Sequence, residues 1–399
     1  MQAITGTTQS YDWGKLGDVS QVAKLASANG LVPDISKPYA ELWMGTHPNG
    51  PSTITGSATT LKSLLNKQTL SPGIYEKYNG DLPFLFKVLS IRKALSIQAH
   101  PDKILAAKLH AERPDIYKDG NHKPEMAIAL TEFEAFIAFR PLEEIAQHLK
   151  EYPEFRDLVG QAGIDFTVSS DVAKNKESLK KLFHALQTST QEQITEAIRK
   201  LISRIHTSTK PLDQLLCRLD SQFKNDVGTF CAFLLNYVTL KPGEAIFLAA
   251  NEPHAYLSGD CIECMAASDN VVRSGLTPKY KDVDTLVSML TYNYGSANKQ
   301  ILTGEQVTKQ TKEYNPPIEE FSIYQTVLDN QNELQAGVQG PSIIIVVNGN
   351  GTFAGDKEFQ AKPGTILFVP SGMEINVKSF GADKLIFYRA FCELPTSRM

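Results

Sequence analysis

KPGEAIFLAANEPHAYL, at residues 241–257, decides the fold because a second stretch of the same design, KPGTILFVPSGMEINVK, stands at residues 362–378. Each copy begins with Lys-Pro-Gly, continues with a short, mostly apolar run, turns, and then resumes as a polar-to-apolar strand. Tight Pro-Gly turns between short strands are typical of jelly-roll barrels. The repeat therefore predicts two such barrels in one chain.

The two copies differ at one position that matters for function. When they are aligned without a gap, His254 of the first copy falls opposite Ile375 of the second. The second copy keeps the turn chemistry but lacks the histidine. We therefore expect one barrel with a functional site and one structural barrel.

The rest of the chain divides by the period of its apolar residues. Runs such as DLPFLFKVLSI and FEAFIAF are typical of strands, whereas the segment between them and the first repeat carries apolar residues at helical spacing. The predicted class is mainly β with an α-helical insertion. The expected parts are the first half of a catalytic barrel at 1–140, an inserted helical domain at 141–226, the second half of that barrel at 227–312, and a C-terminal barrel without metal at 313–399.

Composition excludes several classes of function. The 399 residues carry 40 basic and 44 acidic side chains, which gives a net charge of −4 and no basic cluster for nucleic acid or an anionic membrane. The N-terminus has no apolar signal segment, and no apolar run could span a bilayer. Five scattered cysteines fit reduced thiols better than a disulfide framework. We expect a soluble cytoplasmic protein.

A group of candidate metal ligands begins in LSIQAHPDK, residues 95–103. Gln98 and His100 are two apart in a predicted strand, so their side chains share one face. NHKPEM offers Glu125, and the first repeat offers His254. Two imidazoles, a carboxylate and an amide oxygen suit zinc, with iron or manganese as alternatives. Each residue alone could equally serve a structural role at a strand end; it is the set that predicts a metal site.

Other residues compete for this role or add to it. Cys261 and Cys264 are three apart, so in a strand they face opposite sides and form a poor metal pair. Basic side chains, by contrast, gather in the same segments as the ligands and would suit an anionic substrate such as a phosphate ester. A solvated charged loop would explain the residues around Arg273 equally well.

Longer motifs resemble one family. AELWMGTHPNGPS, LSIQAHPDK, NHKPEMAIAL, NEPHAYLSGDCIECMAASDNVVRSGLTPKYKDV and the YDWG at 11–14 closely resemble the type I mannose-6-phosphate isomerases. The resemblance implies a pair of cupin barrels with an inserted helical domain, one zinc ion per chain and a monomeric enzyme of carbohydrate metabolism, including GDP-mannose biosynthesis. The family's zinc ligands map onto Gln98, His100, Glu125 and His254.

The resemblance also implies a reaction and further site residues. The family interconverts mannose 6-phosphate and fructose 6-phosphate by moving a proton through a cis-enediol. Arg273 is expected to stabilise negative charge, whereas either Lys123 or Glu263 could be the catalytic base, and the group that opens the sugar ring stays unassigned. The remaining expected substrate-binding residues are Lys87, Lys279, Trp13, Glu41 and Ser96.

Two other classes remain open at this point. A cupin metal oxygenase also uses two histidines and a carboxylate, usually around iron, but does not need basic side chains for a phosphate. A non-catalytic sugar-binding cupin would keep the fold without working ligands, and the intact ligand set argues against it.

Overall fold

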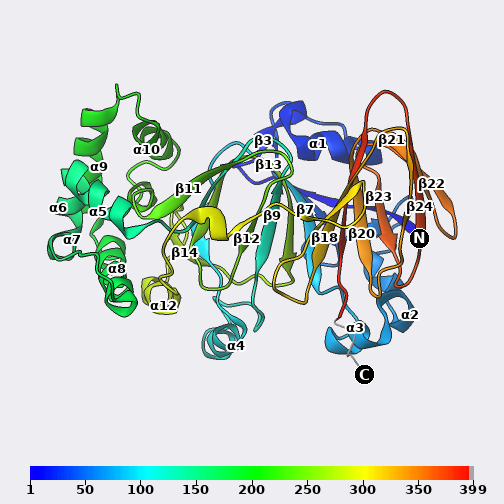
Figure 1. Ribbon diagram of the computed structural model, residues 1–399, viewed down its shortest axis with the longest axis horizontal. Coiled ribbons are helices and arrows are strands. Elements are labelled where there is room, and N and C mark those ends of the chain that lie inside the picture. Colours follow the sequence, from blue (N-terminus) through cyan, green and yellow to red (C-terminus); the bar gives the residue numbers. More distant parts are fainter. Residues whose placement is uncertain (395–399) are drawn as a thin grey trace.

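The computed structural model describes residues 1–394; residues 395–399, at the end of the expected C-terminal barrel, lie outside the described part. Figure 1 shows three parts along the long axis, with helices at one end and two groups of strands beside them. The predicted class, mainly β with a helical insertion, is confirmed. The exact domain boundaries stay predictions.

An 11-stranded sheet, the metal-site sheet, carries the residues expected to be functional. Its longest strand, β13, changes neighbours at Gly259: the first half pairs with β8 and β10, the second with β7 and β9. Gly259 has a φ of 107°, and a Cβ there would lie 2.4 Å from a carbonyl oxygen, so only glycine fits this bend. The strands are β2 (Thr7–Gln9), β5 (Glu41–Met44), β7 (Phe84–Ile91), β8 (Ile97–Ala99), β9 (Glu125–Ala129), β10 (Phe133–Phe139), β11 (Leu235–Leu240), β12 (Ala245–Leu248), β13 (His254–Ala266), β14 (Val272–Gly275) and β15 (Ile301–Leu302).

The second group of strands consists of an 8-stranded and a 4-stranded sheet, here called the C-terminal sheets. Two strands from the start of the chain, β1 and β6, join them by pairing with β23 and with each other, which the sequence pattern did not indicate. The larger sheet contains β1 (Gln2–Thr5), β6 (Thr53–Ile54), β16 (Glu305–Gln306), β17 (Thr311–Tyr314), β18 (Ser322–Leu328), β20 (Ser342–Asn348), β23 (Ile366–Val369) and β25 (Leu385–Phe391). The smaller contains β19 (Asn332–Gln335), β21 (Asn350–Ala354), β22 (Glu358–Ala361) and β24 (Ile375–Phe380).

The repeat has the turn geometry that its sequence predicts. In both copies the glycine of Lys-Pro-Gly has a positive φ, 86° at Gly243 and 91° at Gly364. In both, the amide of the next residue donates to the lysine carbonyl at 2.9 Å, which closes a tight turn. Each turn then leads into a strand of its own sheet, β12 or β23.

Helices fill the expected insertion. In α9, Ile194, Ile198, Leu201 and Ile205 are buried and Ile202 is partly buried, which confirms the predicted apolar stripe as a core face. A capping box at Thr190 begins this helix. The expected insertion contains α5 (Leu142–Glu151), α6 (Pro153–Val159), α7 (Gln161–Ile164), α8 (Val172–Gln187), α9 (Gln191–Ile205) and α10 (Pro211–Gln222), and α11 (Gly228–Cys231) follows just after its expected end. Elsewhere lie α1 (Gln21–Ala26), α2 (Lys67–Leu70), α3 (Pro72–Lys77), α4 (Lys103–Glu112), α12 (Val283–Met289) and the strand pair β3 (Lys15–Leu16) and β4 (Pro38–Tyr39).

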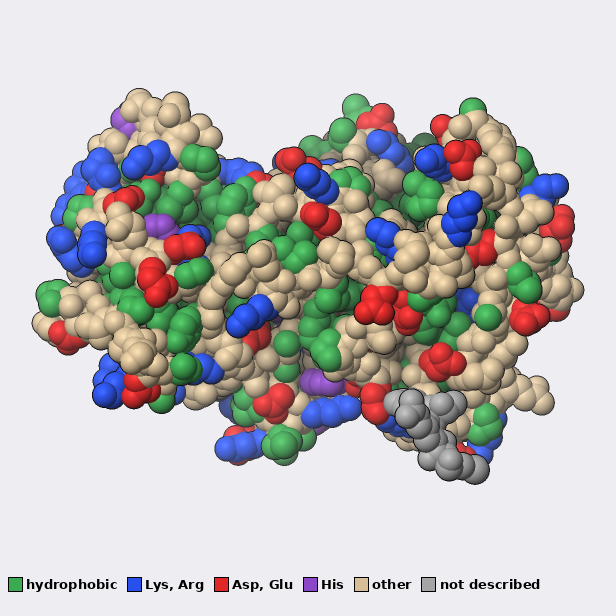
Figure 2. Space-filling view, viewed as in Figure 1, with side chains coloured by type: hydrophobic (Ala, Val, Ile, Leu, Met, Phe, Trp, Pro, Cys, Tyr) green, Lys and Arg blue, Asp and Glu red, His purple; other side chains and the backbone are tan. Residues whose placement is uncertain are grey.

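The two groups of strands share one hydrophobic core. Phe84 and Phe86 of β7 belong to the same buried cluster as Ile343 of β20 and Phe368 of β23. Acidic and basic side chains are interspersed over most of the face shown in Figure 2, as the near balance of charge leads one to expect. None of the helices in residues 1–394 combines the length and apolar character needed to cross a bilayer.

Candidate active site

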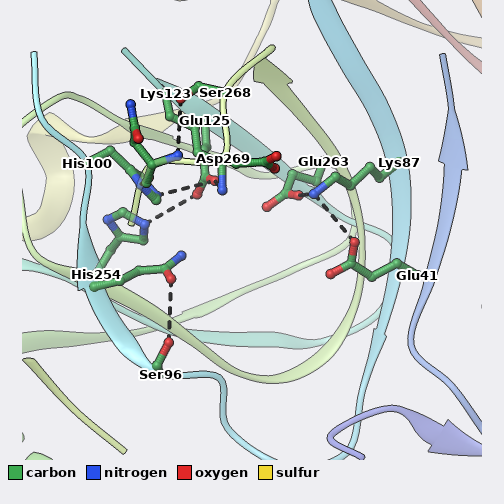
Figure 3. A network of polar contacts seen from close by, with 12 residues as sticks. Glu41, Lys87, Ser96, His100, Lys123, Glu125, His254, Glu263, Ser268 and Asp269 are labelled. Atoms are coloured by element: carbon green, nitrogen blue, oxygen red, sulfur yellow. Dashed lines mark hydrogen bonds and ion pairs between the residues drawn. The ribbon is translucent and has the colours of Figure 1, made fainter. Parts of the chain in front are cut away.

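Three of the four predicted metal ligands meet at one point of the metal-site sheet. His100 directly follows β8, Glu125 begins β9, and His254 begins β13. Their ligand atoms all lie within 4.8 Å of one another. The Nε2 atoms of His100 and His254 lie 3.4 Å and 3.3 Å from the two carboxylate oxygens of Glu125, and Figure 3 shows both imidazoles pointing at that carboxylate.

The hydrogen bonds of the two imidazoles leave one nitrogen of each available. Nδ1 of His100 donates to the carbonyl of Asn270 at 2.6 Å, and Nδ1 of His254 donates to the carbonyl of Glu252 at 3.1 Å. These bonds place the lone pairs on the Nε2 atoms. Both Nε2 atoms are buried without a hydrogen-bond partner among the described residues. Because an orphaned buried polar atom is costly, this arrangement fits a bound cation.

The charges around this group favour the protonation states that a metal needs. Burial lowers the pKa of His100 to about 4, so the imidazole is neutral at neutral pH. Burial alone would raise the pKa of Glu125, but Lys123 and His100 outweigh it and hold the pKa well below its usual range. Neutral imidazole and ionised carboxylate are the forms that bind divalent metals.

Gln98, the fourth predicted ligand, lies beside this group. Its backbone pairs with His254 on one side and with Arg273 on the other. Its side chain lines the neighbouring cavity, and its Oε1 accepts a long hydrogen bond of 3.5 Å from Ser96. So weak a bond leaves the amide oxygen free to take a stronger partner.

A cavity of about 580 Å³ opens above the ligand group. Every other residue predicted for the site lines it, and their roles stay predictions. These residues are Trp13, Glu41, Lys87, Ser96, Lys123, Glu263, Arg273 and Lys279.

One wall of the cavity is a buried charge cluster. Lys87 Nζ lies 3.0 Å from Glu263 and 3.4 Å from Glu41 (Figure 3). It also lies 5.3 Å from the ring centre of Trp43. Burial disfavours the ammonium, but the two carboxylates outweigh it and raise the pKa of Lys87. Burial raises the pKa of Glu263 above its ordinary value, with Glu125 and Glu41 adding to the effect. One lysine shared by two carboxylates therefore leaves Glu263 easier to protonate than a surface glutamate.

The basic side chains divide into paired and unpaired ones. Lys123 Nζ lies 3.2 Å from Glu125, so Lys123, like Lys87, already has a carboxylate partner. Among the described residues, Arg273 and Lys279 make no side-chain hydrogen bond and no salt bridge. Burial lowers the pKa of Arg273, but a guanidinium stays charged at neutral pH. Arg273 and Lys279 are therefore the cations that remain available to an anionic ligand.

His122, next to Lys123, contacts the other group of strands. Its Nε2 lies 2.7 Å from Glu320, which also pairs with Lys103 of α4 at 3.3 Å. Burial alone would raise the pKa of Glu320, but His122 and Lys103 outweigh it and lower the pKa to about 2. A carboxylate between β17 and β18 of the larger C-terminal sheet thus anchors the loop that carries Lys123.

Several polar, charged and aromatic residues that the sequence reasoning did not single out also line the cavity. Asp269 contacts His47 at 3.1 Å, and Tyr256 has a buried hydroxyl without a hydrogen-bond partner among residues 1–394. Tyr256 shares a strand face with His254, so the spacing of two residues could have found it. Asp269 lies in a loop with no periodicity. They include Tyr11, Lys93, Phe223, Tyr256 and Asp269.

The same backbone positions in the C-terminal sheets hold different side chains. Gln335 pairs with Ile375 as Gln98 pairs with His254, and Ser342 pairs with Val369 as Glu125 pairs with Leu248. The buried Arg389 donates to Ser342 at 2.9 Å and weakly to Gln335 at 3.4 Å. A guanidinium thus contacts the side chains that stand where the first copy has Gln98 and Glu125, two of the predicted ligands.

Burying lysines and carboxylates destabilises the fold more than their packing and pairing stabilise it. A cavity lined by such residues therefore indicates catalysis and not a structural core. Fold and site together place the molecule among mainly β enzymes with a two-histidine, one-carboxylate metal-ligand group.

Comparisons with known proteins narrow this class to one family. Profiles of type I phosphomannose isomerase match in three regions: the catalytic domain at residues 1–142, the helical insertion domain at 158–235 and the C-terminal domain at 314–355. The mannose-6-phosphate isomerase of Ogataea parapolymorpha is 46% identical over 98% of both chains. That of Schizosaccharomyces pombe is 44% identical over 99% of this chain and 100% of its own. The chain belongs to the type I phosphomannose isomerase family.

Solved structures similar to this chain belong to the same family. A mutant of phosphomannose isomerase from Salmonella typhimurium superposes with a TM-score of 0.87 at 31% identity, over 99% of this chain and 100% of that one. A zinc-bound mannose 6-phosphate isomerase matches with a TM-score of 0.86 at 31% identity, over 98% and 99% of the two chains. The family resemblance expected from the sequence motifs is confirmed.

Proposed function

We propose that this protein interconverts mannose 6-phosphate and fructose 6-phosphate with one bound zinc ion per chain. The observation that carries the proposal is the pair of buried, orphaned Nε2 atoms of His100 and His254, facing Glu125 at the base of a cavity with unpaired cations. Relatives that align over nearly the whole chain are mannose-6-phosphate isomerases, which supports the same reaction.

His100, His254, Glu125 and the amide oxygen of Gln98 would hold the metal. Two neutral imidazoles, one carboxylate and one amide are a donor set that zinc accepts. A zinc ion there would act as a Lewis acid toward the oxygens next to the reacting carbons. Gln335, Ile375 and Ser342 offer no such set in the C-terminal sheets, which supports one ion and not two.

The unpaired cations suit the phosphate end of the substrate. Arg273 can offer a bidentate fork to a phosphate, and Lys279 adds an exposed positive charge at the cavity rim. Lys87 and Lys123 are held by carboxylates, so their charges are already balanced. We assign Arg273 and Lys279 to substrate binding, and Lys87 to holding Glu263 and Glu41 in place.

Glu263 is the better of the two candidates for the base that moves the proton between carbons 1 and 2. Efficient general bases have a pKa close to the working pH, and burial shifts the pKa of Glu263 in that direction. Lys123 lies against the ionised Glu125 and is better placed to donate a hydrogen bond to a substrate oxygen. Transfer by one base on one face of the sugar fits a cis-enediol intermediate.

A coupled assay for fructose 6-phosphate formation tests the proposal. Activity should disappear after dialysis against a chelator and return when zinc is added, and metal analysis should find about one zinc per chain. His254→Ala should lose the metal and the activity, while His206→Ala, an exposed histidine at the end of α9, should lose neither. Full activity in metal-free protein would refute the proposal, and iron in place of zinc would favour an oxygenase.

A further inference from the structure

Two separate segments of the cavity rim contact the end of the helical insertion. Residues 93–96 follow β7, and residues 276–279 follow β14; both line the cavity. In Figure 1 the helices lie beside the end of the metal-site sheet that carries β14. The segment from the last residue of α10 to the first residue of α11, residues 222–228, makes the contacts with both parts of the rim.

Asp226 bridges the insertion and the second rim segment. Its Oδ1 accepts hydrogen bonds from the amide of Leu276 at 2.6 Å and from the amide of Gly228 at 2.7 Å. Its Oδ2 accepts from the amide of Thr277 at 3.2 Å. Hydrogen bonds to an ionised acceptor are the stronger kind, so one carboxylate fixes two successive rim amides.

The backbone that Asp226 holds would not be stable in this shape by itself. Leu276 has a φ of 53°, a left-handed conformation that costs free energy for a residue with a side chain. Gly228 and Gly275 let the two segments touch, since a Cβ on Gly275 would lie 2.6 Å from the Cα of Gly228. Such a conformation persists only where its surroundings hold it, and Asp226 is that support.

The first rim segment is held from the same end of the insertion. The amide of Ala94 donates to Oε1 of Gln222 at 3.0 Å. Lys93 Nζ lies 4.6 Å from the ring centre of Phe223, within the range of a cation–π contact. Residues 222–228 therefore touch both rim segments, although none of them belongs to the metal-site sheet.

We propose that the helical insertion shapes the phosphate end of the cavity, with Asp226 as the positioning residue of the 276–279 segment. Lys279 ends this segment, and its amide donates to Oγ1 of Thr277, so the amide bonds of Asp226 set where the lysine side chain begins. This inference rests on the proposed phosphosugar substrate. It gives the insertion a role in substrate binding beyond that of a separate helical core.

Kinetics of Asp226 variants test the inference. Asp226→Ala should raise KM for mannose 6-phosphate about tenfold with a smaller change in kcat, because it removes charge-assisted bonds from a binding segment and not from the metal group. Asp226→Asn keeps an oxygen acceptor and should restore KM to within about threefold of wild type. Zinc content should be the same in all three proteins.

Asp213→Ala is the matched control. Asp213, on α10, is a carboxylate of the same insertion and is more buried than Asp226, but it binds Tyr152 and Ser208 and makes no hydrogen bond to the rim. Its loss should lower the melting temperature and leave KM unchanged. An equal rise in KM in Asp213→Ala, or an unchanged KM in Asp226→Ala, would overturn the inference.

Hydrogen exchange without substrate separates this inference from the proposed reaction. Amides of the 276–279 segment should exchange faster in Asp226→Ala than in wild type, and at the wild-type rate in Asp213→Ala. If the wild-type protein shows no isomerase activity, the proposed function fails while this measurement still decides whether Asp226 holds the rim. Unchanged exchange in Asp226→Ala would reject the positioning role.

Discussion

Arg273→Lys should keep the fold and the metal and still damage catalysis. Arg273 lies on β14, paired through its backbone with Gln98, so its position is fixed by the sheet that also carries the metal ligands. Its guanidinium is half-buried at the cavity and makes no hydrogen bond with the other described side chains. All of its donors are therefore available to the substrate, and replacing them breaks no hydrogen bond or salt bridge among the described residues.

The magnitude follows from the number of bonds lost. A lysine keeps the charge but gives up the two-pronged geometry, so one of two charge-assisted hydrogen bonds is lost. Such a bond contributes about 1.5–3 kcal/mol. At about 1.4 kcal/mol for each tenfold change in rate, kcat/KM should fall roughly 10- to 150-fold.

Steady-state kinetics with mannose 6-phosphate and metal analysis of the same preparation measure this effect. A rise in KM alone would assign Arg273 to phosphate binding, whereas a fall in kcat would assign it to the charge that develops during reaction. Arg113→Lys is the control, since Arg113 pairs with Asp282 outside the cavity and should keep both constants. Near-normal constants in zinc-loaded Arg273→Lys would remove this residue from the active site.

Three further outcomes are expected. Gln98→Leu should lose zinc and activity together, because it removes an amide ligand; normal activity with full zinc content would show that Gln98 is not a ligand. Glu320→Gln should lower the free energy of unfolding by about 1–3 kcal/mol at pH 7. The pKa of Glu320 is lowered to about 2 in the folded state, so its contribution to the free energy of unfolding is complete above about pH 4.5 and fades as the pH falls toward 2. Urea unfolding in which Glu320→Gln is destabilised equally at pH 7 and pH 3 would contradict this. Arg389→Ala should lower the free energy of unfolding by about 3 kcal/mol, because it leaves Ser342 and Gln335 without their hydrogen-bond donor. KM and zinc content should stay at wild-type values, and a loss of zinc would refute the separation of Arg389 from the metal-ligand group.

The residues of the metal group could be predicted because local rules govern them. Period-two alternation in a strand places Gln98 and His100 on one face, and the Lys-Pro-Gly turn fixes where β12, the strand before the one that His254 begins, starts. The same kind of rule gave the stripe of α9, since helical spacing is set by the backbone itself. Residue type then predicted a metal site, because imidazole, carboxylate and amide are ligands by their own chemistry.

The sequence by itself thus determined which residues can bind a metal, the two copies of the turn and the helical character of the insertion. Only the tertiary structure decided which charges are already paired: Lys87 meets Glu263 from 176 positions away and Lys123 meets Glu125 nearby, while Arg273 finds no ionic partner within residues 1–394. It also decided that β1 crosses to the C-terminal sheets and that Asp226 holds the cavity rim. The physical reason is that hydrogen bonds and ion pairs depend on distances of about 3 Å, and for residues far apart in the chain those distances are set by how whole sheets and helices pack.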